Sequence, residues 1–207
     1  MKKSLVSLFV AVALIPVVAS AGMFDSLPSL GGGSGGGDLI GAQDKLIVDY
    51  ITADQFVLAG QAKMAEALGL KTEAAAFQAK ADGINKDNVA DSDKSISSDA
   101  VKAIQEAQAK HPVLDNQAKA NYALGVVSLA KGVLKYVSMK DSFQNFSKSL
   151  SSAPMTMLPK LATGAAIVKS LPTNAKNMSD ALSSAVQFSK DEHISLPNDA
   201  SASVAWK

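Results

Sequence analysis

Apolar residues recur at steps of three and four through most of residues 38–190, and this periodicity constrains the fold more than any other feature. Such spacing gathers apolar side chains on one face of an α-helix. No stretch as long as a strand alternates apolar and polar residues. We therefore predict an all-α fold, a helical bundle of about five or six helices. It forms a single domain over residues 38–207 and ends in an irregular tail.

The first three helices are each bounded by a stop signal. The first is predicted from Asp38, a good N-cap, to Leu68, because Gly69 then favours a helix end. The second covers residues 71–82, and the third begins near Ser97 or Ser98 and stops before Pro112. The predicted inner face of the first helix comprises Ile47, Tyr50, Ile51, Ala53, Val57, Leu58, Gly60, Met64, Ala67 and Leu68.

The most apolar helix is predicted over residues 113–150, and its composition is typical of the central helix of a bundle. Gly125 and Gly132 within it are spaced by seven. Glycine inside a helix costs roughly 1 kcal/mol relative to alanine, so we expect a neighbouring helix to approach closely there. Two further helices are predicted, one ending near residue 171 because Pro172 follows, and one over residues 174–190.

Residues 1–21 have the pattern of a secretory signal peptide. Two lysines precede an almost unbroken apolar run from Leu5 to Val18, and residues 19–21 (Ala-Ser-Ala) have the small-x-small form that signal peptidase accepts. The run is shorter than the roughly 20 apolar residues of a membrane span, which disfavours an uncleaved anchor. We expect cleavage between Ala21 and Gly22, and export to the periplasm or the medium.

Residues 22–37 form a Gly/Ser-rich arm between the signal and the helical domain. Residues 31–37 are six Gly and one Ser, a composition typical of a flexible tether that spans roughly 15 Å. The arm is predicted to be disordered, as a remnant of the export signal. Alternatively, it is a tethered apolar peptide that binds the body, a partner or a lipid surface. Phe24, Leu27 and Leu30 would then be the partner-binding residues.

Composition excludes several kinds of chemistry. The 207-residue chain has no Cys and two His, and all 20 of its basic residues are Lys. Thiol chemistry and Cys-based metal sites are therefore impossible. A chain without Arg and with a formal net charge of +1 is a poor candidate for binding nucleic acid. Loss of the two signal lysines leaves 20 − 2 = 18 Lys against 19 acidic residues.

Neither the acidic loop at residues 85–94 nor the acid–histidine cluster predicts a metal site. Counted from Asp91, an EF-hand loop needs Gly and Glu at positions six and twelve, where the chain has Ile96 and Lys102. Residues 191–193 (Asp-Glu-His) are adjacent and would point in different directions on a helix. A nucleophile elbow and a nucleotide-binding Gly motif are also missing from the sequence. We predict no catalysis, no metal and no cofactor.

Two functions fit these expectations. The first is an exported helical binding or structural protein of the cell envelope, with an unknown protein or envelope partner and no nucleic acid. The alternative is a membrane-active protein whose apolar hairpin at residues 122–171 inserts into lipid. Lys131, Lys135 and Lys169 interrupt that hairpin, and a charge at the bilayer centre costs about 2.5–3.5 kcal/mol on insertion scales, which disfavours insertion. The partner's identity and the oligomeric state stay open.

Overall fold

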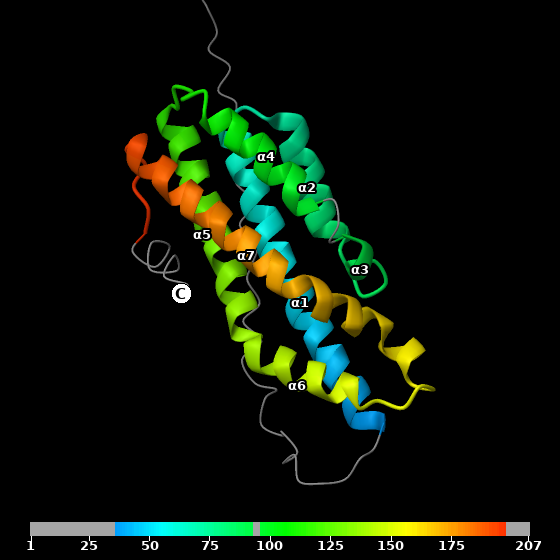
Figure 1. Ribbon diagram of the computed structural model, residues 1–207. Coiled ribbons are helices and arrows are strands. Elements are labelled where there is room, and N and C mark those ends of the chain that lie inside the picture. The colour runs from blue at the N-terminus through cyan, green and yellow to red at the C-terminus, as the bar shows by residue number, and fades with distance from the viewer. Residues whose placement is uncertain (1–35, 93–95, 198–207) are drawn as a thin grey trace, which may run out of the picture. The chain divides into compact units, whose positions relative to one another are not determined.

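The computed structural model describes residues 36–92 and 96–197, which all lie in one unit of the chain, residues 35–207. The predicted signal peptide, the predicted arm up to residue 35 and the last ten residues lie outside the described part. The described helices are α1 (Gly36–Ala67), α2 (Lys71–Gly83), α3 (Val89–Ser92), α4 (Ile96–Gln108), α5 (Asn116–Ser138), α6 (Lys140–Ser151), the short 3-10 helix η1 (Leu158–Leu161) and α7 (Ala162–Asp191) (Figure 1). The predicted all-α helical bundle is confirmed.

Helices α1 and α5 form the most extensive helix pair of the described bundle. They run antiparallel, with Gly60 against Gly125 and Val57 against Gly132. A Cβ atom added to Gly60 would lie 2.7 Å from the carbonyl oxygen of Gly125 and 2.7 Å from the backbone nitrogen of Leu129. The two backbones therefore touch, as the spacing of the glycines in α5 predicts.

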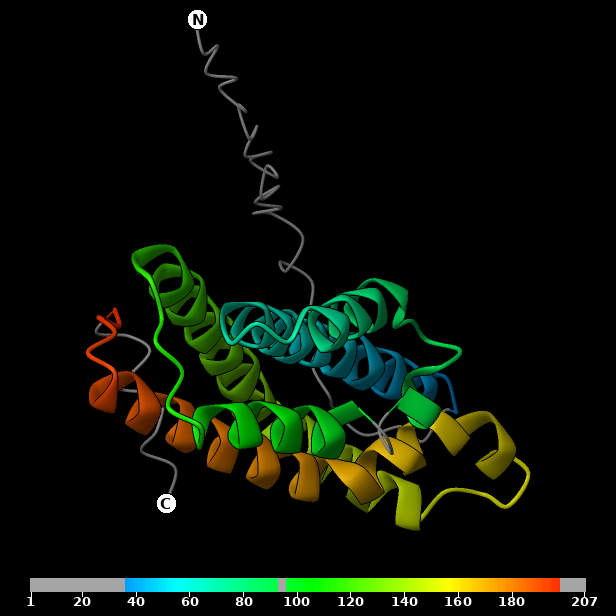
Figure 2. The same ribbon diagram turned by 90° about the horizontal axis from the view of Figure 1, so that it is seen from above.

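Helix α7 crosses the α1–α5 pair and completes the core (Figures 1 and 2). Helix α2 packs along α1, and α4 lies beside α7. The chain turns between α1 and α2 at Gly69, whose φ of +80° favours glycine. The core is filled by large, fully buried side chains from α1, α5 and α7: Leu46, Tyr50, Leu58, Tyr122, Leu129, Ile167, Met178 and Leu182.

The predicted continuous helix over residues 113–150 is wrong, because the chain divides there into α5 and α6. Helix α5 begins only at Asn116, where the carboxylate of Asp115 accepts a hydrogen bond from the third amide that follows it, at 2.8 Å. The division falls at Met139, whose side chain is buried. The turn lets α6 place Phe146 against Gly164 of α7. Burial of these side chains, rather than local propensity, sets the boundary.

The predicted helix end at Pro172 is also wrong, because α7 continues through this residue. Proline inside a helix removes one backbone hydrogen bond and costs about 3 kcal/mol or more. Pro172 is exposed, so water can bond the carbonyl that it leaves unpaired, whereas Leu171 and Asn174 beside it are buried. Burial of the side chains on this inner face of α7 outweighs the free-energy cost of a proline inside the helix. The acidic loop predicted at residues 85–94 likewise contains a short helix, α3.

Candidate functional site

Four polar side chains are buried where α1, α5 and α7 meet. Tyr136 donates its hydroxyl hydrogen to Asp54, and the side-chain amide of Asn174 donates to the hydroxyl oxygen of Tyr50 at 2.7 Å. The centroids of the two tyrosine rings are 5.6 Å apart. Because these groups are buried and bonded to one another, they fix the positions of three helices and offer no access to a substrate.

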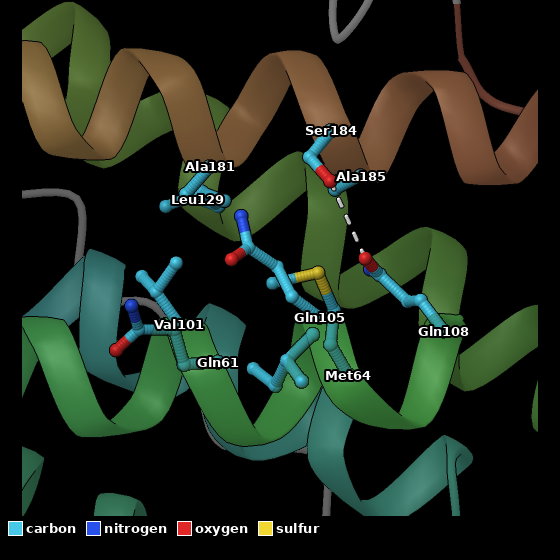
Figure 3. A pocket seen from close by; sticks show the side chains of 10 residues that line it. Gln61, Met64, Val101, Gln105, Gln108, Leu129, Ala181, Ser184 and Ala185 are labelled. Carbon is cyan, nitrogen blue, oxygen red and sulfur yellow. Dashed lines mark hydrogen bonds between the residues drawn. The ribbon is translucent and has the colours of Figure 1, made fainter. Parts of the chain in front are cut away.

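A small cavity lies beneath α4, between it and α1, α5 and α7 (Figure 3). Its volume is about 10 Å³, which is the space of a single water molecule. It is therefore too small for an organic ligand or a substrate. Its lining combines four polar with six apolar side chains: Gln61, Gln105, Gln108, Ser184, Met64, Val101, Ile104, Leu129, Ala181 and Ala185.

Gln61 is the one side chain in the described part of the bundle with a buried polar atom that has no hydrogen-bond partner, its Oε1. The residue is only 1% exposed, and its Nε2 atom lies 3.7 Å from the thioether sulfur of Met178, a weak acceptor. Gln108 across the cavity is better bonded, because it donates to the Tyr122 hydroxyl and accepts from Ser184 at 3.4 Å. Burial raises the pKa of Tyr122 above its usual range, so this hydroxyl stays protonated.

His111 and Glu192 form a pair that the sequence did not predict. The Nδ1 atom of His111 lies 3.1 Å from Oε1 of Glu192, and the ammonium of Lys119 donates to the Glu192 carbonyl at 2.6 Å. These contacts join the loop before α5 and the first turn of α5 to the residue that follows α7. Within residues 36–92 and 96–197, no group of three His, Cys, Asp or Glu side chains is arranged to hold a metal ion.

The exposed side of the α1–α5 pair carries apolar side chains and lysines. Seven large apolar side chains are exposed among the described residues, and four of them come from α1 and α5. At 3.6 residues per turn, Val48, Phe56 and Leu124 lie on the side of each helix opposite to its contacts with α7, and Leu134 lies about a quarter of a turn from Leu124. We call this surface the outer face, and it comprises Val48, Phe56, Leu124, Leu134, Lys45, Lys63, Lys131 and Lys135.

One acidic side chain lies among the lysines of the outer face. Asp49 bonds both Lys45, at 3.1 Å, and Lys135, at 2.7 Å. Its partial burial acts to raise the pKa of this carboxyl, but the hydrogen bonds from the two lysines outweigh that effect and lower it. Lys63 and Lys131 are exposed and form no ion pair with any side chain that the structure describes. The face therefore carries unneutralised positive charge.

The sequence-predicted binding residues are not placed by the structure. Phe24, Leu27 and Leu30 lie outside the described residues, as do the predicted signal peptide and most of the predicted arm. The stretch at residues 122–171, predicted as an apolar hairpin, contains α5, α6, η1 and the start of α7. The apolar side chains on the inner side of α5, within this stretch, are buried in the core. In the described part of the chain, no helix combines the length and the apolar character needed to span a membrane.

Comparison with known proteins gives no relative from which a function could be transferred. No family model matches the chain, and neither a curated protein nor a solved structure matches it with significance.

Proposed function

We propose that this chain is an exported, non-catalytic binding protein of the cell envelope, and that the outer face of α1 and α5 is its binding surface. The observation that carries the proposal is the clustering of Val48, Phe56, Leu124 and Leu134 on one exposed side of two helices. Exposed apolar side chains that gather on one surface, with polar residues around them, mark interaction sites in folded proteins. The signal-peptide pattern of residues 1–21 supports an envelope or extracellular location.

The N-terminal arm provides a second contact in this proposal. Phe24, Leu27 and Leu30 would bind the same partner or its surroundings, and the Gly/Ser tether at residues 31–37 would allow both contacts at once. Deletion of residues 22–37 should then weaken envelope association while leaving the melting temperature nearly unchanged. A large loss of thermal stability on deletion would place the arm in the core instead.

Cell fractionation tests the proposal directly. Producing cells are separated into cytoplasm, periplasm, medium and membrane pellet, and the intact mass of the chain is measured in each. We expect the chain to begin at Gly22 and to lie outside the cytoplasm. The double variant Phe56→Ser/Leu124→Ser should shift it from envelope-associated to freely released fractions.

The control for this experiment uses exposed apolar residues away from the outer face. Val113 is 100% exposed and Met155 is 82% exposed, so Val113→Ser/Met155→Ser removes at least as much exposed apolar area elsewhere. It should not change the distribution. An unprocessed chain confined to the cytoplasm would refute the export proposal, and equal behaviour of the two double variants would refute the outer face.

Insertion of residues 122–171 into lipid remains the alternative proposal. It requires Tyr122, Leu129 and Ile167 to leave the core, where all three are fully buried. A chain of mature mass that resists a carbonate wash of the membrane pellet would favour this alternative, because carbonate releases proteins that only bind a surface.

A further inference from the structure

We infer that the outer face binds the surface of an anionic phospholipid bilayer. The inference rests on the proposed function and names its partner by chemistry: closely spaced phosphate groups above an acyl layer. It follows from the arrangement of apolar and cationic side chains along α1 and α5.

The register of the two helices interleaves these side chains. Because Val57 lies against Gly132 and Gly60 against Gly125, Lys131 of α5 is level with Phe56 of α1. By the same register, Leu124 of α5 is level with Lys63 of α1. From Val48 to Lys63 the face is about 22 Å long at 1.5 Å per residue. Apolar groups and ammonium groups thus alternate along it.

The charge of the face is positive. Helix α5 has no acidic residue between Asn116 and Ser138, although it contains three lysines. On α1, Asp49 is already shared by two lysines. Two further acidic side chains of α1 lie near these lysines: Asp44 is 3.8 Å from Lys86 of the loop before α3, and Glu66 is exposed on the same side of α1 as Val48, three residues from Lys63. Lys63 and Lys131 are thus left to attract an anionic partner.

This pattern fits a bilayer surface better than a second copy of the chain. Two copies joined through this face would bring lysines near lysines, with only Asp49 and Glu66 of each copy to compensate. Protein interfaces also concentrate their apolar anchors in a central cluster, whereas Phe56 and Leu124 are here separated by lysines. At a bilayer, the apolar side chains enter the boundary of the acyl layer and the lysine ammonium groups stay at the phosphates.

Vesicle sedimentation of the purified mature chain, residues 22–207, tests the inference. We expect it to bind vesicles of phosphatidylglycerol mixed with phosphatidylcholine, and to bind pure phosphatidylcholine vesicles much more weakly. Binding should fall as salt rises, since salt screens exposed charges. The variant Lys63→Glu/Lys131→Glu should lose roughly tenfold or more in affinity, because each lysine near an anionic surface contributes about a factor of five.

A matched control reverses two lysines on other faces. Lys102 of α4 and Lys169 of α7 are exposed, so Lys102→Glu/Lys169→Glu changes the net charge by the same amount. It should retain most of the affinity. Phe56→Ser/Leu124→Ser should weaken binding without changing its salt dependence. Melting curves by circular dichroism should show that all three variants are folded.

Several outcomes would overturn the lipid inference. These are equal loss of affinity in the two lysine variants, equal binding to both kinds of vesicle, and no vesicle binding by the unmodified chain. Binding lost only on deletion of residues 22–37 would assign it to the arm. If vesicle binding fails but Phe56→Ser/Leu124→Ser still releases the chain from cells, the proposed function survives with a protein partner.

If light scattering shows that the purified chain is a dimer and Phe56→Ser abolishes this dimer, the partner is a second copy of the chain.

Discussion

Helices α5 and α4 are held against α1 in different ways. Between α5 and α1, Gly60 and Gly125 bring the two backbones into contact. Between α4 and α1, Gln61 and Gln108 occupy the interface and a cavity remains. Both α4 and α5 have apolar residues spaced by three and four positions. Small residues at the point of closest approach, rather than amphipathic character alone, therefore determine how tightly a helix of this bundle is held.

Hydrogen exchange should show the largest difference between these two helices. Helix α5 has buried residues in every turn from Tyr122 to Tyr136 and forms the most extensive helix pair with α1, whereas α4 packs less extensively on α1 and α7 and buries only Ile104, Ala107 and Gln108 among its described side chains. Helix α4 should therefore open locally, while the central amides of α5 exchange only on global unfolding. We expect exchange in α4 to be roughly a hundredfold faster, equivalent to about 2.8 kcal/mol in opening free energy. Equal protection would show that α4 is as firmly packed as α5.

A single methyl group at the α1–α5 contact should destabilise the protein. In Gly60→Ala, the new Cβ atom meets backbone atoms of Gly125 and Leu129, which cannot move without separating the helices. Overpacking of this kind costs about 1–3 kcal/mol, and the better helix propensity of alanine returns about 1 kcal/mol. Thermal denaturation should show a net loss of stability of up to about 2 kcal/mol.

Gly41 provides the matched control in the same helix. A Cβ atom added there has no neighbour within 4 Å, so Gly41→Ala should stabilise the protein by about 0.5–1 kcal/mol through helix propensity alone. If both substitutions stabilised the protein, the close approach at Gly60 would not exist in solution.

Much of the fold could be predicted because its signals are local. Apolar periodicity identifies α1 and α2 to within two residues of their observed limits, and the spacing of Gly125 and Gly132 identifies the contact face of α5. The division at Met139 and the continuity through Pro172 could not be predicted. In both cases distant packing decides the outcome, through Phe146 against Gly164 and through burial on the inner side of α7.

The polar contacts of the interior were beyond sequence analysis for the same reason. Gln43 of α1 donates to the carbonyl of Lys160 and accepts from the backbone amide of Gly164, both at 3.0 Å. It thereby satisfies an unpaired amide in the first turn of α7. Its partners are 117 and 121 residues away in the chain, and a Gln in an Ala-rich helix resembles an exposed residue. The outer face was also missed, because its apolar and cationic residues belong to two helices.

Replacement of the unpaired polar group beneath α4 should sharpen the contrast between the two interfaces. A buried acceptor without a partner costs about 1–3 kcal/mol, so Gln61→Leu, which removes Oε1 and keeps a similar size, should stabilise the protein by about 1 kcal/mol. The control Gln108→Leu removes an amide that is bonded on both sides, and it should destabilise the protein by about 1–3 kcal/mol. A loss of stability in Gln61→Leu would show that a hydrogen-bond donor occupies the cavity in solution.

The smallest expected effect comes from Asp49, which joins α1 to α5 at the edge of their contact. Hydrogen bonds from Lys135 and Lys45 lower the pKa of Asp49 despite its partial burial. A carboxyl whose pKa is lower in the folded state stabilises the fold above its ordinary pKa of 3.8, and this stabilisation is lost as the pH falls below that value. Chemical denaturation should show Asp49→Asn to be less stable at pH 7 by under about 1 kcal/mol, with the difference shrinking below pH 4.

Asp180 supplies the control for this measurement, because it pairs with Lys176 on the exposed surface of α7 and joins no other helix. Asp180→Asn should change stability by no more than a few tenths of a kcal/mol at pH 7. Added salt should reduce the effect of Asp49→Asn only in part, since Asp49 and Lys135 are partly buried and less screened. If the Asp49→Asn difference stayed constant down to pH 2, the contribution of Asp49 would be packing rather than charge, and the α1–α5 contact would depend on its glycines alone.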